Sequence, residues 1–415
     1  MRFVLASYGS RGDVEPCAAL GRELLRRGHD VRVAVAPDLV GFIESAGLDA
    51  VAYGLDTQHW IAGQRDFEVC LTRSFWKVPQ VIRLGREAWK LFAQCWQETS
   101  ATLMSLAEGA DVLVTGLAFE GAAANVAEYH DVPLATLHTF LSRANGQGLG
   151  RAAGTAIEWL VWRLWKKVDD AQRRELGLPK AKSPWPRRID ERGSLEIQAY
   201  DQVCFPELAA EWAESNGQRP FVGALTLELP APADEEVLSW IAAGTPPIYF
   251  GFGSMPVESA SDTLAMVGAA CAEIGERALV CSGWTDFSDV PHLEHVKVVS
   301  AVNHSAVFPA CRAVVHHGGA GTTAAGLRAG VPTLILWMLG DQPRWGAAVK
   351  RLKVGSGRSL STTTTESLVT DLRTILEPQY AARSREIASR MTKTSESIAA
   401  AADHLEDFAR LRRVG

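Results

Sequence analysis

The sequence lacks an excess of basic residues, closely paired cysteines and any long apolar run. Its formal net charge is -6 and its pI is near 6.0, which argues against nucleic-acid binding, because nucleic-acid-binding proteins usually present a basic face. The seven cysteines are scattered and include no C-x-x-C pair, so neither a zinc site nor a disulfide framework is indicated. No run reaches the roughly 18 apolar residues of a membrane span, and the first residues do not resemble a signal peptide. We therefore expect a protein of the reducing cytoplasm.

The composition is that of a globular protein, and the chain is too long for one ordinary core. Hydrophobic residues make up 47% and charged residues 22%, and a length of 415 residues predicts two or three domains. We expect a first domain over residues 1–215, an interdomain linker rich in Pro, Gly, Ala and acidic residues over 216–236, and a second domain over 237–395. The last segment, 396–415, is predicted to be a helix that either caps the second domain or crosses back to the first.

Apolar strands alternate with helical stretches in both halves of the chain. Residues 2–8 have a buried-strand pattern, a tight turn follows at 9–12, and an amphipathic helix is predicted from Glu15 to Arg27. Beyond the linker the pattern restarts with a strand at 247–252. Such alternation is typical of parallel sheets covered by helices on both faces, so the predicted fold class is α/β with two Rossmann-like domains.

The segment 312–345 is the most informative part of the sequence. A short apolar strand at 313–315 ends at His316 and His317, and a glycine-rich turn at 318–321 leads into a helix of small residues. This turn presents free backbone N–H groups and about half a positive charge at the helix start, an arrangement that suits phosphate oxygens.

A second strand, at 333–337, leads to the pair Asp341 and Gln342. Because the carboxyl ends of parallel strands share one sheet edge, this pair is expected beside the phosphate turn, where open α/β sheets bind ligands. The pair is suited to sugar hydroxyls, although an Asp-Gln pair before a proline is otherwise a common helix cap. Together the two segments indicate a site for a diphosphate that carries a sugar.

Six motifs carry a resemblance to a known family. They are YGSRGDVEP at 8–16, GFGSM at 251–255, SGW at 282–284, VNH at 302–304, HHGGAGTT at 316–323 and GDQPRW at 340–345. With these motifs the chain resembles, over nearly its whole length, nucleotide-sugar-dependent glycosyltransferases of the GT-B fold, in the branch of antibiotic, sterol and glycopeptidolipid glycosyltransferases. The resemblance implies two Rossmann-like domains facing across a cleft, with the acceptor on the N-terminal domain and the donor on the C-terminal one.

The resemblance implies a donor site made of a diphosphate cradle, a sugar-binding pair and a base pocket. The implied contacts are His317, Gly319, Gly321, Thr322 and Ser254 for the diphosphate, Asp341 and Gln342 for the sugar, and Trp284 and Val302 for the base. Ser254 is otherwise a turn serine, Trp284 a core residue and His316 a packed or capping histidine. Preorganised donors aimed at developing charge are typically the largest catalytic contribution. No D-x-D motif lies beside the site, so we expect transfer without a metal and with no cofactor other than the UDP- or dTDP-sugar.

The catalytic residues expected from the resemblance are Asp13 and His317. Asp13 follows the first strand and is the candidate general base for the acceptor hydroxyl. The adjacent helix start should lower its pKa, and aspartate is common before helices as a cap, so a capping role stays open. A carboxylate can still accept the proton late in the reaction. Ser10 and Arg11 in the same loop are possible diphosphate contacts, and Arg11 could instead be solvent-exposed.

The acceptor side is less well defined. Trp159, Trp162 and Trp165 share one helix face and precede a basic stretch, which favours either a peripheral contact with the inner membrane face or buried packing beside a solvated face. The acceptor-binding residues are not identified by the sequence. A hydrophobic or amphiphilic acceptor would fit the first interpretation.

The sequence therefore predicts an inverting glycosyltransferase that uses a UDP- or dTDP-sugar and a hydroxyl of a glycopeptidolipid, sterol or natural-product aglycone. The alternative is a catalytically silent relative that assists another glycosyltransferase. A nicotinamide-dependent oxidoreductase is disfavoured, because Gly9–Gly12 lacks the G-x-G-x-x-G spacing.

Overall fold

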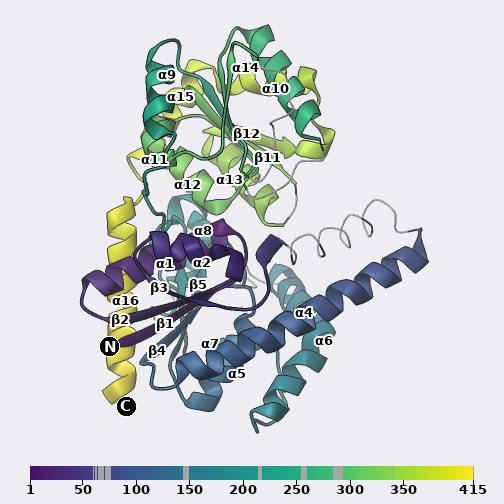
Figure 1. Ribbon diagram of the computed structural model, residues 1–415, viewed down its shortest axis with the longest axis vertical. Helices are drawn as coiled ribbons and strands as arrows, with labels where there is room; N and C mark the ends of the chain where they lie inside the picture. The colour runs from purple at the N-terminus through teal and green to yellow at the C-terminus, as the bar shows by residue number, and fades with distance from the viewer. Residues whose placement is uncertain are drawn as a thin grey trace. The chain divides into compact units, whose positions relative to one another are not determined.

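The computed structural model describes residues 1–58, 60, 63, 70, 76–143, 149–213, 217–253, 259–283, 293–338 and 340–414. The described residues form two parallel sheets of six strands each, both covered by helices (Figure 1). The contacts divide the chain into two compact units. The first comprises Met1–Ala199, Leu208–Leu225 and Ser395–Gly415, and the second comprises Tyr200–Glu207 and Thr226–Thr394.

The sheet of the first unit is built outward from its central strand. Its order is β3-β2-β1-β4-β5-β6, so the chain builds one side, returns to the centre and then builds the other. The topological switch point lies between β1 and β4, where ligands of open α/β sheets bind. The strands are β1 (Arg2–Ser7), β2 (Asp30–Val35), β3 (Asp49–Ala52), β4 (Val112–Thr115), β5 (Leu134–His138) and β6 (Leu195–Gln198).

Helices bury both faces of this sheet. Successive residues of β1 point to opposite faces, and Phe3, Val4, Leu5 and Ala6 are all fully buried. Trp96 of α4 packs in the same core cluster as Val4 and Ala6. The helices of this unit are α1 (Arg11–Arg26), α2 (Val40–Ser45), α4 (Val78–Ala107), α5 (Glu120–His130), α6 (Leu149–Glu175), α7 (Trp185–Glu191), most of α8 (Pro206–Trp212) and α16 (Thr394–Val414).

The second unit repeats the same plan. Its sheet order is β12-β11-β10-β7-β8-β9, with the switch point between β7 and β10. Phe250 and Tyr249 of β7 enter two different core clusters, one on each face of the sheet. The strands are β7 (Ile248–Gly251), β8 (Ala278–Cys281), β9 (Val296–Val299), β10 (Ala313–His316), β11 (Thr333–Trp337) and β12 (Gly355–Ser359). The helices are α9 (Asp234–Ala242), α10 (Ala260–Ile274), α11 (His304–Val307), α12 (Ala320–Ala329), α13 (Gln342–Leu352), α14 (Thr365–Ile375) and α15 (Pro378–Ala388).

The α/β class with two Rossmann-like sheets is confirmed, and one helix boundary is corrected. The helix predicted from Glu15 begins at Arg11, because Ser10 and Asp13 form a capping box that starts it four residues earlier. Pro16 therefore lies inside the helix and not in its first turn.

The stretch 216–236 divides between the two units. Backbone N–H groups of Glu196 and Gln198 donate to the carbonyls of Gln218 and Pro220, so this part of the stretch extends the β6 edge of the first sheet. At the other end, Asp234 already begins α9 of the second unit.

The final helix, α16, packs on the first unit. Arg27 at the end of α1 donates to the carboxylate of Asp403 at 2.7 Å, and His29 lies 2.9 Å from a carboxylate oxygen of Glu406. Leu405 on this helix is fully buried, whereas Leu411, six residues later, is 74% exposed.

Substitution Leu405→Ala should lower the free energy of unfolding by about 2–5 kcal/mol, because it removes buried methyl groups and leaves a cavity. Leu411→Ala makes the same chemical change at an exposed site of the same helix and should stay within about 0.5 kcal/mol of the parent. Urea unfolding followed by circular dichroism measures both. Equal effects of the two substitutions would contradict the packing of α16.

Candidate functional site

The carboxyl edge of the second sheet carries three close glycine turns. Gly253 follows β7 with φ 61°, Gly283 follows β8 with φ 57°, and Gly318 follows β10 with φ 98°. A Cβ atom on Gly253 would lie 2.7 Å from Cε1 of His317, and one on Gly319 would lie 2.8 Å from Nε2 of the same ring. The His317 imidazole is therefore held between two turns that exclude side chains.

The start of α12 presents unbonded backbone donors at this edge. Thr323 N–H makes the first bond of the helix, to the carbonyl of Gly319 at 2.9 Å. The N–H groups of Ala320, Gly321 and Thr322 precede that bond and have no acceptor within the helix. The first turn of α12 contains no acidic residue. The positive end of the helix dipole thus coincides with the open donors, which is an arrangement suited to an anion.

The two histidines differ in role. His316 is fully buried, and its Nδ1 accepts the N–H of Gly318 at 3.0 Å, so it fixes the turn that follows it. Burial lowers the pKa of His316 well below its ordinary value. His317 is partly exposed, and burial lowers its pKa to about 4. Both rings are consequently neutral at pH 7, so His317 offers a hydrogen bond and not a permanent charge.

Asp341 and Gln342 lie beside the same turn. A Cβ atom on Gly318 would be 3.3 Å from the Cα of Gln342, so the pair and the turn are in contact. Asp341 accepts the indole N–H of Trp345 at 2.8 Å, and Gln342 accepts the N–H of Met338 at 2.7 Å. Burial raises the pKa of Asp341. These hydrogen bonds hold both side chains in defined orientations.

The expected base-pocket residues are only partly described. Val302 lies in the loop after β9, partly buried against the core cluster of Tyr249 and Phe308. The next residue, Asn303, donates its N–H to Asp234 at 2.8 Å, which ties this loop to α9. Ser254 and Trp284 lie outside the described residues.

In the first unit, Asp13 lies at the switch point between β1 and β4. Its Oδ2 accepts the N–H of Ser10 at 2.7 Å and the Ser10 hydroxyl at 3.0 Å. Gly9 has φ 134°, and a Cβ atom there would overlap the Asp13 carboxylate. The structure thus gives Asp13 the hydrogen bonds of a helix cap and fixes its carboxylate at the sheet edge.

Arg11 is the first residue of α1 and is exposed. Its Nε is 3.3 Å from Glu15, and its guanidinium lies over the ring of Phe42 at 4.7 Å. In this structure the Arg11 guanidinium therefore interacts with residues of its own unit.

Sequence reasoning missed a buried ionic network that joins the start of α5, the end of β5 and the strand β6. Arg143 makes a bidentate pair with Glu120 and a further bond to Glu196, and His138 lies 3.1 Å from Glu120. Although burial opposes ionisation, the charge of Arg143 lowers the pKa of Glu120 to about 2. Phe119, just before Glu120, has φ 59°, a left-handed conformation that is uncommon for a residue other than glycine. The residues of this network are far apart in the sequence, so no local sequence pattern predicts it.

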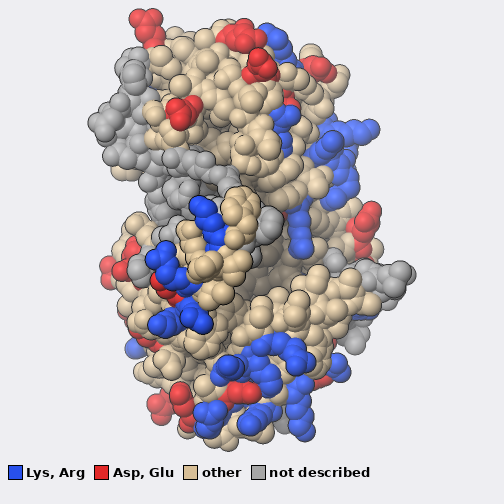
Figure 2. Space-filling view, turned by 90° about the vertical axis from the view of Figure 1, so that its right-hand side faces the viewer, with Lys and Arg blue, Asp and Glu red and all other residues tan. Residues whose placement is uncertain are grey.

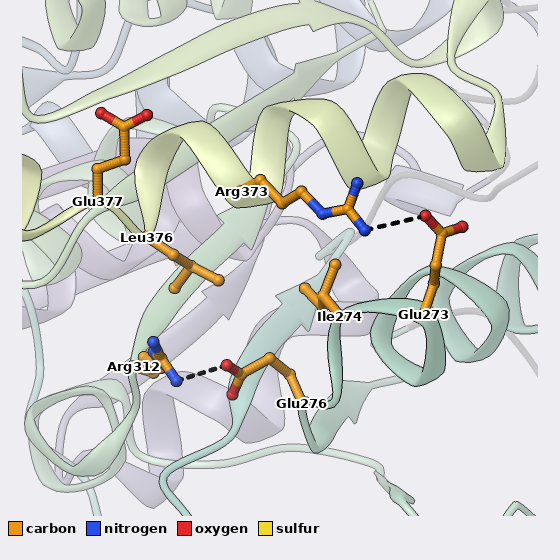
Figure 3. A pocket seen from close by; sticks show the side chains of 7 residues that line it. All are labelled: Glu273, Ile274, Glu276, Arg312, Arg373, Leu376 and Glu377. Carbon is orange, nitrogen blue, oxygen red and sulfur yellow. Dashed lines mark hydrogen bonds and ion pairs between the residues drawn. The ribbon is translucent and has the colours of Figure 1, made fainter.

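One surface pocket lies at the opposite edge of the second sheet (Figure 3). It includes Arg312 and Glu276, which pair with each other just before β10 and β8 begin, and the pair of Arg373 with Glu273. Since it borders the amino ends of the strands, this pocket is separate from the glycine turns.

The described residues contain neither a metal-binding cluster nor a membrane-spanning helix. In that part of the chain no group of three or more His, Cys, Asp or Glu side chains could hold a metal ion. Among the same residues, each helix is too short or too polar to span a lipid bilayer.

Comparison with known proteins shows the family. Residues 3–144 match the glycosyltransferase family 28 N-terminal domain, and residues 262–405 match the erythromycin biosynthesis protein CIII-like C-terminal domain. The chain is 60% identical to an uncharacterized glycosyltransferase of Mycobacterium tuberculosis, over 100% of both chains. It is 28% identical to the sterol 3-beta-glucosyltransferase UGT80B1 of Arabidopsis thaliana, over 97% of this chain and 67% of the plant protein.

Solved structures show the same fold. The glycotransferase of kitacinnamycin superposes with a TM-score of 0.73 at 17% identity, covering 98% of this chain and 99% of that one. Glycosyltransferase VinC, solved in complex with DTDP, superposes with a TM-score of 0.67 at 19% identity and covers 100% of both chains. With two parallel sheets, matched family domains at both ends and a relative identical at three positions in five, the chain belongs to the glycosyltransferases of the GT-B fold.

Proposed function

We propose that this glycosyltransferase transfers a sugar from a UDP- or dTDP-linked donor to a hydroxyl of a hydrophobic or amphiphilic acceptor, with inversion and without a metal ion. The observation that carries the proposal is the cradle at the start of α12, where free N–H groups and a positive helix end meet the ring of His317. The VinC complex with DTDP supports a nucleoside diphosphate as the ligand. The sterol 3-beta-glucosyltransferase supports a lipid-like acceptor hydroxyl.

The proposed role of the cradle is to stabilise the leaving nucleotide. As the bond from the anomeric carbon to the diphosphate oxygen breaks, negative charge grows on that oxygen. The amides of Gly319 and Gly321, the Thr322 hydroxyl and the neutral His317 ring would donate hydrogen bonds to the diphosphate. Because these donors are fixed by the turn and by α12, they need little reorganisation during the reaction. Ser254, Ser10 and Arg11 are further proposed diphosphate contacts.

The sugar and the base would lie on either side of the diphosphate. Asp341 and Gln342, already oriented by Trp345 and Met338, are proposed to bind sugar hydroxyls. Trp284 and the backbone of Val302 are proposed to bind the base.

Asp13 is proposed as the general base, and its cap hydrogen bonds are part of that proposal. The bonds from Ser10 hold the carboxylate in one orientation at the sheet edge. They also weaken its basicity, as does the start of α1. The proton would therefore pass to Asp13 late, after the acceptor oxygen has begun to bond to the anomeric carbon.

The donor assignment is tested by thermal denaturation with a panel of UDP- and dTDP-sugars. A sugar nucleotide present at about 100 times its dissociation constant should add about 2.7 kcal/mol to the stability of the folded state. One nucleotide series should raise the melting temperature, and nucleoside diphosphates of the other base should have smaller effects. If no nucleotide of either series changes the melting temperature, the proposed donor site is wrong. If a donor binds but the purified chain turns over no donor with any sterol or lipid acceptor, the chain is instead an accessory partner.

The role of Asp13 is tested by a matched pair of substitutions. Asp13→Asn keeps an oxygen that can accept the bonds from Ser10 but cannot take a proton, so kcat should fall by about 100-fold or more. Ser10→Ala keeps the carboxylate and removes a cap bond, so the unfolding free energy should fall by about 0.5–2 kcal/mol with a smaller loss of kcat. Steady-state turnover and urea unfolding of both variants distinguish the roles. Near-normal turnover by Asp13→Asn would contradict the general-base role and show that Asp13 acts only as a helix cap.

A further inference from the structure

The first unit exposes an apolar stripe on α6. Ile157, Leu160 and Leu164 are 61%, 63% and 62% exposed, and Val161 beside them is 40% exposed. Their spacing places them on one face of the helix. A different face of α6 packs into the unit, where Trp162 is buried and its indole N–H donates to the buried carboxylate of Asp169 at 3.0 Å. Since α6 already packs into the unit through that face, the exposed apolar stripe indicates a further contact.

The neighbouring helix α4 carries a second stripe. Val78, Ile82 and Trp89 are 55%, 48% and 39% exposed and recur at intervals of four and seven residues. The two helices pack together, since the rings of Phe92 and Trp165 stack at 3.9 Å between centroids. The apolar surface therefore belongs to one pair of packed helices, visible in Figure 1 as long helices of the first unit.

Basic residues accompany both stripes. Residues 76–90 contain Lys77, Arg83, Arg86 and Lys90 with one acid, Glu87. Residues 151–167 contain Arg151, Arg163, Lys166 and Lys167, again with one acid, Glu158. The whole chain, in contrast, has 42 basic and 48 acidic residues. In the lower part of Figure 2 a group of Lys and Arg lies beside a surface with few charged residues.

We propose that α6 and the first half of α4 bind the surface of an anionic lipid bilayer. The apolar side chains of α6 would enter the boundary of the acyl chains, while Arg163 and Lys167 contact the lipid headgroups. The basic charge of this surface favours anionic lipid over a second copy of the chain. Two copies would bring two basic surfaces together, which is unfavourable. The contact extends the proposed function by bringing the enzyme to amphiphilic acceptors, but it does not depend on sugar transfer.

Flotation with lipid vesicles tests the proposal. The full chain should float with vesicles that contain phosphatidylglycerol at low salt, less at high salt, and little with pure phosphatidylcholine vesicles. Leu160→Gln combined with Leu164→Gln should lower the partition coefficient at least about tenfold. Arg163→Gln combined with Lys167→Gln should lower binding at low salt and reduce its salt dependence. Leu25→Gln, at a 46% exposed site on α1, is the matched control and should bind like the parent.

Each contrary outcome overturns the proposal. The proposal fails if the parent does not float with anionic vesicles at low salt, if it floats equally with neutral ones, or if the Leu160/Leu164 variant floats like the parent. It also fails if sedimentation shows that the parent is a dimer and the Leu160/Leu164 variant is a monomer, because the stripe is then a contact between two copies of the chain. Nucleotide affinity, measured by calorimetry on the same variants, should remain unchanged, so failure of membrane binding is separable from failure of the donor site.

Discussion

The close approach of glycine turns to the ring of His317 is the constraint on which the candidate site depends. β7 and β10 are adjacent and parallel, so their carboxyl ends deliver Gly253 and Gly318 to the same switch point. The backbone can surround the imidazole only because neither Gly253 nor Gly319 has a side chain. His316 then fixes the turn from behind through its bond to Gly318. The backbone N–H donors at the start of α12 and the ring of His317 therefore lie together at one edge of the sheet. This arrangement depends on the sheet packing, the turn geometry and the direction of α12.

Most strands of the fold were predictable from the sequence, including the edge strand β9, whereas three of the four edge strands were not. β1, β7 and β10 are buried on both faces and therefore appear as apolar runs. Three strands that sequence patterns did not predict, β3, β6 and β12, lie at sheet edges. The sequence of β12 is GSGRS, which has no apolar residue. Its strand conformation depends on pairing with β11, a tertiary contact that no local pattern expresses.

The candidate site was predictable where one segment supplies it and not where distant segments meet. The glycine turn after β10 is one continuous segment, so its residue types and spacing predict its local geometry. The bonds from Trp345 to Asp341 and from Ser10 to Asp13 are also local, yet both side chains have several possible partners, and the choice is made by the folded backbone. The Glu120–Arg143 pair joins segments on either side of β5, so only the sheet topology brings it together.

The most direct test of the account is the affinity of UDP and dTDP for a variant that combines His317→Ala with Thr322→Ala. Hydrogen bonds to a charged group are each worth about 1.5–3 kcal/mol, so calorimetry should show affinity weakened by at least about 100-fold. His295→Ala changes a comparably buried histidine at the opposite edge of the same sheet and should leave nucleotide affinity unchanged. Equal nucleotide affinity in the double variant and the parent would contradict the assignment of this turn as the diphosphate site.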